Sequence, residues 1–339
     1  MKIQQQSARK LHTNILTALW KTLAVIFIVL ICIVIFLFSA MALIIHGPSI
    51  SARELFVTSC METSFAKLFP PLYLSDEEIS TIIIKNSVVE IEEVTNTSAD
   101  FTDNTDGVNK EQMDVEVIDI TGSTYKGKMI LVKDPSRVVV ECPPAFGADS
   151  SGEKLDYMIS KINGVAGINA GGFFDNKGAG NGGIAEGIVI KNSEVKNGND
   201  GATSVVVGFD DKNVLRVGSM TVAKAKEIKL RDAVSFGPAL VVNGKPAQVS
   251  GSGGGLNPRT AIGQREDGTV LLLVIDGRQP QSLGASYKDI VDIMIEHKAI
   301  NAGNLDGGSS SMMYYKGELI NQCASLYGPR KIATGFIVK

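Results

Sequence analysis

The feature that most constrains this chain of 339 residues is an uncharged apolar stretch near its beginning. Leu23–Ile45 reads LAVIFIVLICIVIFLFSAMALII, and these 23 residues would form a helix about 34 Å long, enough to span a bilayer with some tilt. The stretch is apolar all round, unlike the one-sided apolar face of a helix that packs on a soluble core. It is also longer than the apolar region of a secretory signal, although Ser39–Ala42 is a weak match to a cleavage site.

Charges on the two sides of this stretch predict its orientation. Beyond the stretch the main nearby positive charge is Arg53, whereas four basic residues precede it: Lys2, Arg9, Lys10 and Lys21. The positive-inside rule therefore predicts a single-pass protein of the cell membrane, with residues 1–22 as a cytoplasmic tail, residues 23–45 as the transmembrane helix and the C-terminal bulk outside the cell.

Composition excludes several classes of protein. The chain has 33 basic and 36 acidic residues, a net charge of −3, so it lacks the positive surface that nucleic acid requires. It has 35 glycines and few aromatic residues, which favours a loop-rich sheet protein. Cys32 lies in the apolar stretch, and Cys60, Cys142 and Cys323 show no metal-binding spacing. A Cys142–Cys323 bridge and three free buried thiols remain alternatives.

Two regions follow the apolar stretch. Residues 46–112 are predicted to form a juxtamembrane stalk that ends in a polar linker, because TNTSADFTDNTDGVNKEQ is polar and aperiodic. From residue 113 onward, short apolar runs alternate with turn residues. Residues 113–339 are therefore predicted to form one domain.

The pattern within residues 113–339 predicts an α+β fold: a mixed, mostly antiparallel sheet with a few packed helices, preceded by the transmembrane helix. KMILVKD and RVVVEC are interpreted as paired strands, and Asn243-Gly244 is a strong hairpin signal. TVLLLVIDGR is typical of a central strand that is buried on both faces. EKLDYMISKI has helical spacing, and SYKDIVDIMIEHKAI predicts an amphipathic helix that Ser286 caps.

The residue inventory limits the chemistry. The three histidines are His12 in the cytoplasmic tail, His46 at the membrane edge and His297 within the amphipathic helix. They do not suit a Ser-His-Asp triad or a multi-histidine zinc site. GSGGGLNPR, residues 251–259, lacks the Lys-Ser/Thr of a phosphate-binding P-loop, which leaves a flexible loop or an active-site lid. Any chemistry must therefore rest on carboxylates, arginines, amides and backbone groups.

Four segments share one pattern, an apolar strand that ends in a glycine-flanked polar residue. They are INAGGFFD with Asn169 and Asp175, NPRTAIG with Arg259, VIDGR with Asp276 and Arg278, and NLDGGSSS with Asn304, Asp306, Ser309 and Ser310. Each could be an ordinary turn, but strand ends are also where scaffolds present functional side chains. Two arginines suit recognition of phosphate. Carboxylates suit acid/base or nucleophilic catalysis at a glycosidic bond, or ligation of a hard cation.

INAGGFFD, FGPALVVNG, NPRTAIGQREDGTVLLLVIDGRQPQSLGAS and INAGNLDGGSSSMMYYKGELIN, in this order, resemble the phosphodiester glycosidase family over residues 125–339. That family includes the uncovering enzyme, N-acetylglucosamine-1-phosphodiester α-N-acetylglucosaminidase, and bacterial envelope relatives. The resemblance implies cleavage between a sugar's anomeric carbon and a phosphodiester, which frees the sugar and leaves a phosphomonoester. Ser309 stands where the family has a third glycine, and the N-terminal anchor favours a bacterial envelope member.

Roles for individual residues follow from the pattern and the resemblance together. Asp306 is the first choice as catalytic carboxylate, with Asp276 as its partner and Glu186 in reserve. Phosphate and sugar binding are assigned to Arg259, Arg278, Asn169, Asn304, Gly307, Gly308, Ser309 and Ser310, where the arginines and the glycine amides hold the phosphate and the asparagines bind sugar hydroxyls or an acetamido group.

The expected function is that of a membrane-anchored extracytoplasmic hydrolase. It would cleave the glycosidic bond of a GlcNAc-type sugar-1-phosphodiester in a cell-envelope glycopolymer or exopolysaccharide. The sequence leaves the aglycone and the oligomeric state undetermined, and it predicts no required cofactor, although Ca²⁺ or Mg²⁺ would suit the carboxylates. Two alternatives remain: a non-catalytic module that binds polysaccharide or assists its assembly, and a metal-dependent phosphodiesterase that cleaves the P–O bond.

Overall fold

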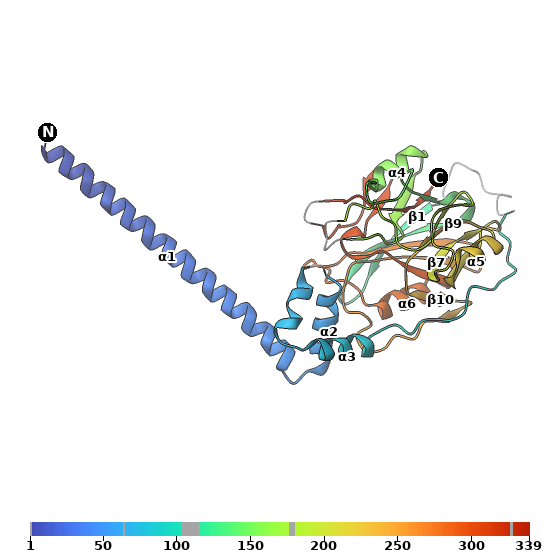
Figure 1. The fold of residues 1–339 in the computed structure, drawn as a ribbon, viewed down its shortest axis with the longest axis horizontal. Coiled ribbons are helices and arrows are strands. Elements are labelled where there is room, and N and C mark those ends of the chain that lie inside the picture. The colour runs from blue at the N-terminus through green and yellow to red at the C-terminus, as the bar shows by residue number, and fades with distance from the viewer. Residues whose placement is uncertain (1, 64, 103–114, 176–179, 326–327) are drawn as a thin grey trace. The chain divides into compact units, whose positions relative to one another are not determined.

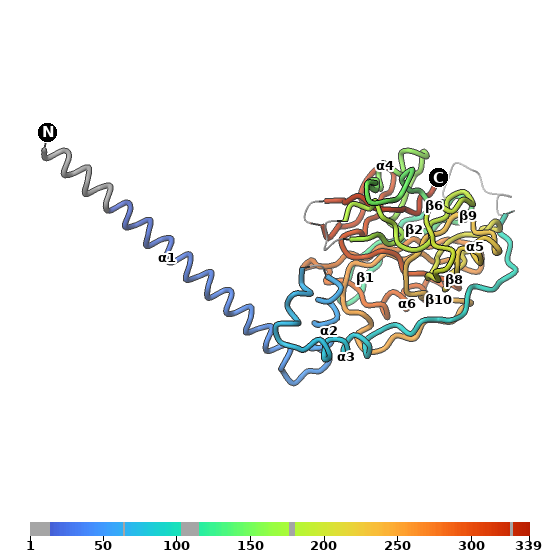
Figure 2. Tube along the Cα trace, in the orientation of Figure 1, coloured from blue at the N-terminus to red at the C-terminus, as the bar shows by residue number. Residues whose placement is uncertain are grey.

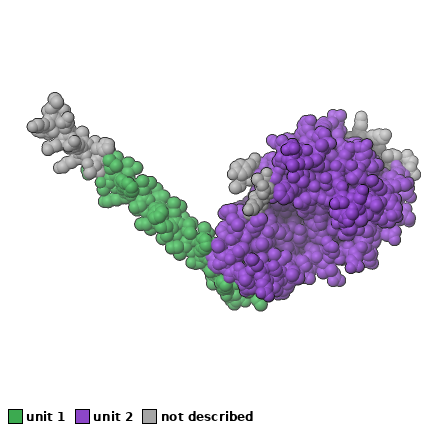
Figure 3. Space-filling model, viewed as in Figure 1, with its two compact units in different colours: residues 1–56 green, residues 57–339 purple. Residues whose placement is uncertain are grey.

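The computed structural model describes residues 2–63, 65–102, 115–175, 180–325 and 328–339. It divides into two compact units, Met1–Phe56 and Val57–Lys339, which Figure 3 colours separately. Residues 103–112 of the predicted polar linker lie outside the described residues. The second unit begins at Val57, whereas the sequence pattern placed the start of the domain at residue 113.

The first unit is dominated by α1, Lys2–His46. Within it, Asn14–His46 has the length and apolar composition of a membrane span, and this range contains the predicted span 23–45. It is the one helix with these properties in the part of the chain that the structure describes.

The rest of the chain contains short helices. They are α2 Ile50–Met61, α3 Asp76–Lys85, α4 Leu155–Lys161, α5 Val222–Glu227 and α6 Tyr287–Glu296, with 3₁₀ turns η1 Ala66–Leu68, η2 Pro70–Leu72, η3 Pro135–Arg137 and η5 Gly308–Ser310.

The strands form three sheets, and every strand pairing within them is antiparallel. The seven-stranded sheet has the order β1 Val115–Thr121, β2 Lys126–Val132, β13 Val270–Ile275, β12 Arg259–Arg265, β14 Ala299–Leu305, β10 Ala239–Val242, β11 Lys245–Pro246. One five-stranded sheet has the order β16 Glu318–Leu319, β15 Met313–Tyr315, β4 Ala166–Asn169, β17 Gly335–Val338, β3 Val138–Glu141. The other has the order β6 Glu194–Asn197, β5 Val189–Lys191, β9 Leu230–Ser235, β7 Ser204–Asp210, β8 Leu215–Met220.

The seven-stranded sheet is buried on both faces, which explains the continuous apolar run in β13. Leu272 and Val274 join the core that this sheet shares with the two smaller sheets, whereas Leu271 and Leu273 join a second core beneath α6. Successive side chains of a strand point to opposite faces, so one uninterrupted run supplies both cores. The α+β prediction and the central position of this strand are confirmed.

Helices α4, α5 and α6 pack against strands of these sheets (Figure 1). α6 packs against β10, β12 and β14, and Ser286 begins it with a capping box that Asp289 completes. α4 lies beside the C-terminal strand β17, near the end of the chain in the trace of Figure 2. The predicted helix within EKLDYMISKI and the predicted cap at Ser286 are therefore confirmed.

The described residues between Val57 and Thr102 pack against the rest of the second unit, to which they belong. α3 buries Ile79 and Ile82. Val88 forms a bridge with Val249, and the backbone N–H of Thr95 donates to the carbonyl of Val217 at 3.0 Å. This part of the predicted stalk thus belongs to the folded unit.

One predicted strand pairing is wrong. KMILVKD and RVVVEC form β2 and β3, but β2 pairs with β1 and β13, while β3 pairs with β17 in a different sheet. The turn η3 between them carries the chain from one layer to the next instead of closing a hairpin. The Asn243-Gly244 hairpin between β10 and β11 is confirmed. All four cysteines carry free thiols, so Cys142 and Cys323 form no bridge.

Candidate active site

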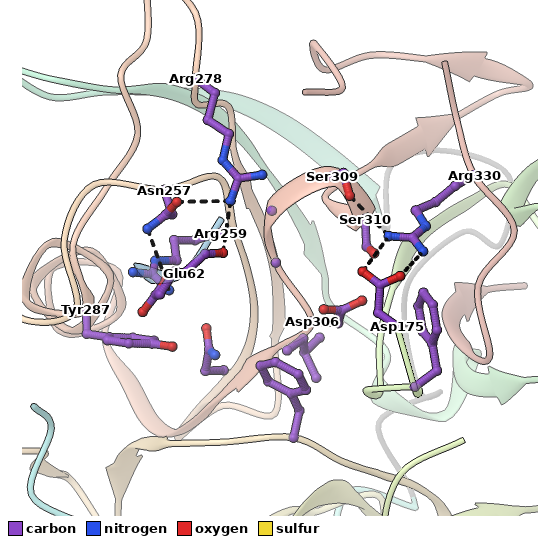
Figure 4. Close-up of a pocket in the computed structure, with 16 residues that line it drawn as sticks. Glu62, Asp175, Asn257, Arg259, Arg278, Tyr287, Asp306, Ser309, Ser310 and Arg330 are labelled. Atoms are coloured by element: carbon purple, nitrogen blue, oxygen red, sulfur yellow. Dashed lines mark hydrogen bonds and ion pairs between the residues drawn. The ribbon is translucent and has the colours of Figure 1, made fainter. Parts of the chain in front are cut away.

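A pocket of about 340 Å³ lies at the ends of the central strands β12 and β14 of the seven-stranded sheet (Figure 4). β12 runs antiparallel to both β13 and β14, with Arg259 opposite Ile275 and Thr260 opposite Leu305. The first residue of β12 therefore meets the last residues of its two neighbours. This register explains how Arg259, Arg278 and Asp306, which are separated in sequence, all line one cavity.

Asp306 follows β14 at the bottom of the pocket. Its backbone N–H donates to the carbonyl of Ala170 at 2.8 Å, and the Asn169 amide donates to its carbonyl. Burial raises the pKa of the Asp306 carboxyl to about 7, against the opposing effect of hydrogen bonds from Ser310 and the Gly307 N–H. A carboxyl group with this pKa can exchange a proton with a reactant near neutral pH.

A second carboxyl group, that of Asp175, lies beside Asp306 and is held by Arg330 (Figure 4). Nη2 of Arg330 donates to Oδ1 of Asp175 at 2.7 Å, and Nη1 donates to Oδ2 at 3.2 Å. Burial opposes ionisation of Asp175, but the bonds from Arg330 and the Gly180 N–H leave its pKa below the ordinary value. The two neighbouring carboxyl groups therefore have pKa values shifted in opposite directions, the arrangement that separates acid and base roles.

Arg330 is itself fixed in place. Its guanidinium group lies 4.9 Å from the centroid of the Phe173 ring and donates to the Gly180 carbonyl and to Oγ of Ser309. The side chain thus connects the β4 end of the site to the turn that follows Asp306.

Arg259 is buried, and each nitrogen of its guanidinium group has a partner within the protein. Nε donates to the carbonyl of Ala285, and Nη2 donates to the carbonyls of Gly254 and Gly255. Nη1 forms a 2.8 Å ion pair with Glu62 from the segment after α2, and the guanidinium lies 4.0 Å from the Tyr287 ring centroid. Arg259 therefore holds the glycine-rich loop 251–255 in place, and only Nη1 points toward an anionic side chain.

Arg278 is more available. Its Nη2 donates to Oδ1 of Asn257 at 3.1 Å and to the Glu62 carbonyl at 3.3 Å. Among the residues that the structure describes, its Nε and Nη1 have no hydrogen-bond partner. Its φ of 59° is a strained value for a residue with a Cβ, and such strain is concentrated at functional sites.

The turn Gly307–Ser310 passes directly beneath Arg278. A Cβ atom on Gly308 would lie 3.3 Å from Nη2 of Arg278, and the φ of Gly308 is +60°. Glycine is therefore required here both by the backbone and by the close approach of the guanidinium. Figure 4 shows Arg278 and Arg330 on opposite sides of Ser309, with Asp306 below.

Asn304 contributes an unsatisfied acceptor. Its side chain is buried in the pocket wall, and Nδ2 donates to the Gly237 carbonyl at 2.8 Å. Its Oδ1 has no hydrogen-bond partner among the described residues. A buried polar atom without a partner costs roughly 1–3 kcal/mol, so a hydroxyl or amide N–H of a ligand would be stabilised there.

The family model of the phosphodiester glycosidases (NAGPA) matches residues 163–339, more than half of the chain. The chain belongs to the phosphodiester glycosidase family. The matched region includes every residue of the pocket described above except Glu62.

Two relatives illustrate the breadth of this family. The chain is 31% identical over 223 residues to the SPbeta prophage-derived uncharacterized protein YomE of Bacillus subtilis, a match that covers 60% of this chain and 33% of that protein. The chain therefore spans about a third of the length of that relative. In fold it resembles the zebrafish N-acetylglucosamine-1-phosphodiester α-N-acetylglucosaminidase catalytic domain, which is described as auto-inhibited by its pro-peptide, with a TM-score of 0.57, 21% identity and coverage of 68% of this chain and 85% of that one.

Not all site residues expected for a phosphodiester glycosidase enter the pocket. Arg259, Arg278, Asn304, Asp306 and the turn 307–310 line it. Asp276 instead accepts bonds from Asn321 and the Gln322 N–H outside the lining. Asn169 lies behind the pocket, where it binds the backbone of Asp306 and Met312.

Glu186 also lies outside the lining of this pocket. Its side chain is exposed, although one carboxylate oxygen would approach a Cβ on Gly172 to 3.3 Å. No three His, Cys, Asp or Glu side chains cluster in a metal-binding arrangement within the described ranges.

Several lining residues were not assigned a role from the sequence, among them Glu62, Asp175, Tyr287 and Arg330. Asp175 did end one of the four strand-end segments, so its position carried a signal. Glu62 and Arg330 had none, because each reaches the site from a loop without the strand-glycine pattern.

Proposed function

We propose that this phosphodiester glycosidase is a membrane-anchored hydrolase that cleaves the bond between an anomeric carbon and a phosphodiester, in a GlcNAc-type glycan of the cell envelope. The observation that supports this most directly is the placement of Asp306, whose pKa is about 7, between Arg278 and Arg330 in one pocket. A substrate of this kind needs a reactive carboxyl group next to a cation that binds phosphate.

In the proposed reaction, Arg278 binds the phosphate through its unpaired Nε and Nη1 above the Gly307–Ser310 turn. The departing phosphate is a weak base, so its release requires little protonation. The ionised carboxylate of Asp306 then assists attack at the anomeric carbon, as a base toward water or as the nucleophile. The C–O bond breaks, its electron pair leaves with the phosphomonoester, and water supplies the new hydroxyl group of the sugar.

The sugar would lie on the Asp306 side of the phosphate. Phe173 and Phe236 line the pocket there, and the unpaired Oδ1 of Asn304 would accept a hydrogen bond from a hydroxyl or acetamido group. Arg259, whose donors are mostly occupied by backbone carbonyls, would position the phosphate site through Glu62 and the glycine-rich loop.

Topology is part of the proposal. We infer that α1 crosses the cell membrane with the N-terminus in the cytoplasm, because basic residues gather before Leu23. The pocket would then face the envelope, where glycans joined through phosphodiesters are available as substrates.

Hydrolysis of a GlcNAc-1-phosphodiester in ¹⁸O-water tests the chemistry. Cleavage of the C–O bond leaves the phosphomonoester unlabelled, whereas cleavage of the P–O bond places the label on phosphorus, where ³¹P NMR detects it. The phosphate is the better reporter, because the anomeric oxygen of a free sugar exchanges with water. Labelled phosphate would establish a phosphodiesterase, and binding without product would establish a non-catalytic glycan-binding module.

A further inference from the structure

A second groove, of about 450 Å³, adjoins the pocket. Its apolar wall is formed by Met61 at the end of α2, Ile83 on α3, Val88, Pro238 and the ring of Tyr287. The wall is continuous with the site described above, because Glu62 and Tyr287 line both cavities.

Most polar side chains of this groove are already bonded to the protein, and the carboxylate of Glu90, which also lines the groove, is exposed to solvent. Asn86 donates to the Ile82 carbonyl at 2.8 Å and accepts the N–H of Ser252 at 2.6 Å. Thr58 and Ser252 share a hydrogen bond of 2.9 Å, and Ser87 donates to the Ile84 carbonyl. A ligand in this groove would therefore meet apolar surface and few free hydrogen-bonding groups, which suits a hydrocarbon chain and disfavours a sugar.

The junction of the two cavities is cationic. Arg259 stacks over Tyr287 and pairs with Glu62, and Arg278 donates to the Glu62 carbonyl. A phosphodiester bound by Arg278 has two ester arms. If its sugar lies beside Asp306, its other arm points toward the junction and the groove.

We propose that this groove binds an apolar aglycone, so that the substrate is an amphiphile in which a sugar is joined through phosphate to a hydrocarbon chain. The proposal rests on the proposed function, because it assigns the second arm of the same phosphodiester. Chain order supports it: the groove wall is built from α2, α3 and the segment after α3, which follow the apolar helix α1 directly. A substrate with a hydrocarbon tail is held in the bilayer that α1 would span.

Exposed apolar side chains in the same segment fit a site that receives its ligand from a membrane. Phe65, Leu68 and Leu72 are between 58% and 69% exposed. These residues belong to η1 and η2 or adjoin them, close in the chain to the groove wall.

Binding of alkyl phosphates without a sugar tests the groove independently of turnover. Full-length protein in lipid nanodiscs is titrated with butyl phosphate and octyl phosphate by calorimetry, with empty nanodiscs subtracted. Because each buried methylene contributes up to about 0.8 kcal/mol, octyl phosphate should bind at least about tenfold more tightly. Equal affinities for the two phosphates would overturn the proposal.

Ile83→Gln and Ile84→Gln form a matched pair on α3. Ile83 lines the groove, whereas Ile84 is 74% exposed and does not. Ile83→Gln should reduce the octyl-over-butyl preference at least about threefold, which corresponds to the loss of roughly one buried methylene, and Ile84→Gln should leave it unchanged. Equal effects of both variants would contradict a specific groove.

Measurements of turnover distinguish failure of the apolar subsite from failure of the proposed glycosidase activity. Methyl and octyl diesters of GlcNAc-1-phosphate are compared as substrates of the same nanodisc protein. Hydrolysis of both with equal kcat/KM would keep the glycosidase and reject the apolar subsite. Chain-dependent binding without hydrolysis of either would keep the subsite and reject the glycosidase.

Discussion

Nη2 of Arg330 donates to Oδ1 of Asp175 at 2.7 Å, and this ion pair lies beside the carboxyl group of Asp306 (Figure 4). Asp175 has a cation in direct contact and a lowered pKa, whereas Asp306 is buried without such a contact and has a pKa of about 7. The difference in pKa between these neighbouring acids has two causes: desolvation raises the pKa of Asp306, and the hydrogen bonds from Arg330 and the Gly180 N–H lower the pKa of Asp175. This difference assigns the exchangeable proton to Asp306 and the negative charge to Asp175.

Asp306→Asn should lower kcat for a GlcNAc-1-phosphodiester by about 100-fold to 10,000-fold, because the amide keeps the shape of the side chain but cannot act as base or nucleophile. Steady-state kinetics measure the loss, and circular dichroism should show an unchanged fold. Asp119→Asn on the exposed edge strand β1 is the matched control and should retain wild-type kcat. Activity retained by the Asp306 variant would remove this residue from catalysis.

The strand-end pattern in the sequence predicts Arg278, Asn304, Asp306 and the turn 307–310 at one site, and all of them line the pocket because strand pairing brings those ends together. It also suggested Asp276, which does not enter the pocket. Simple alternation would send residues 276 and 278 to the same side, but the φ of 59° at Arg278 breaks the extended conformation and separates them.

Contributions from distant segments could not be predicted from local pattern. Glu62 reaches Arg259 from a segment that reads as a juxtamembrane stalk, and no sequence periodicity links the two residues. Arg330 lies in an irregular loop, and its role depends on its contact with Asp175. The pairing of KMILVKD with RVVVEC failed for a similar reason, since a short turn joins two layers as readily as it closes a hairpin.

The pH dependence of kcat/KM should follow the ionisation of Asp306. The ionised form is the reactive one, and the pKa is about 7, so kcat/KM should rise tenfold per pH unit below about 7 and level off above it. Arg330→Gln removes a positive charge that lowers the pKa of Asp306, so the rising limb should move to higher pH by about one unit. A limb that stays in place in this variant would show that another group controls the rate.

Stability should depend on pH through the same residue. Asp306 has an ordinary pKa of 3.8 and a folded-state pKa of about 7, so the folded state binds the proton more tightly than the unfolded state does. The protein should therefore lose stability as pH rises from 3.8 toward 7, with a total cost of at most roughly 4 kcal/mol. Asp306→Asn removes this cost, so its Tm should exceed that of the wild type at pH 8 by more than at pH 5. An equal difference in Tm at the two pH values would contradict a buried, protonated Asp306.

Arg259→Ala should act mainly on stability. The substitution leaves Glu62 without its charged partner and removes the donor to the carbonyls of Gly254, Gly255 and Ala285. Loss of one member of a fully buried ion pair typically costs about 3–5 kcal/mol of unfolding free energy, and the cost here should lie below that range because the Glu62 side chain is 33% exposed. Thermal melts of the full-length protein measure this, and a Tm equal to that of the wild type would show that Arg259 is free to bind ligand.

Arg278→Ala should instead act on substrate choice. Its Nε and Nη1 have no partner among the described residues, so their removal leaves few protein groups unsatisfied and should change the Tm little. A hydrogen bond to a charged group contributes about 1.5–3 kcal/mol, so kcat/KM for the sugar phosphodiester should fall by about 10-fold to 150-fold. An aryl glycoside of the same sugar lacks the phosphate and should be hydrolysed by the variant as well as by the wild type. Arg265→Ala, at the far end of β12 where Nε donates to the carbonyl of His297, is the control for loss of a positive charge. Equal losses on both substrates would mean that Arg278 supports the site as a whole and does not recognise phosphate.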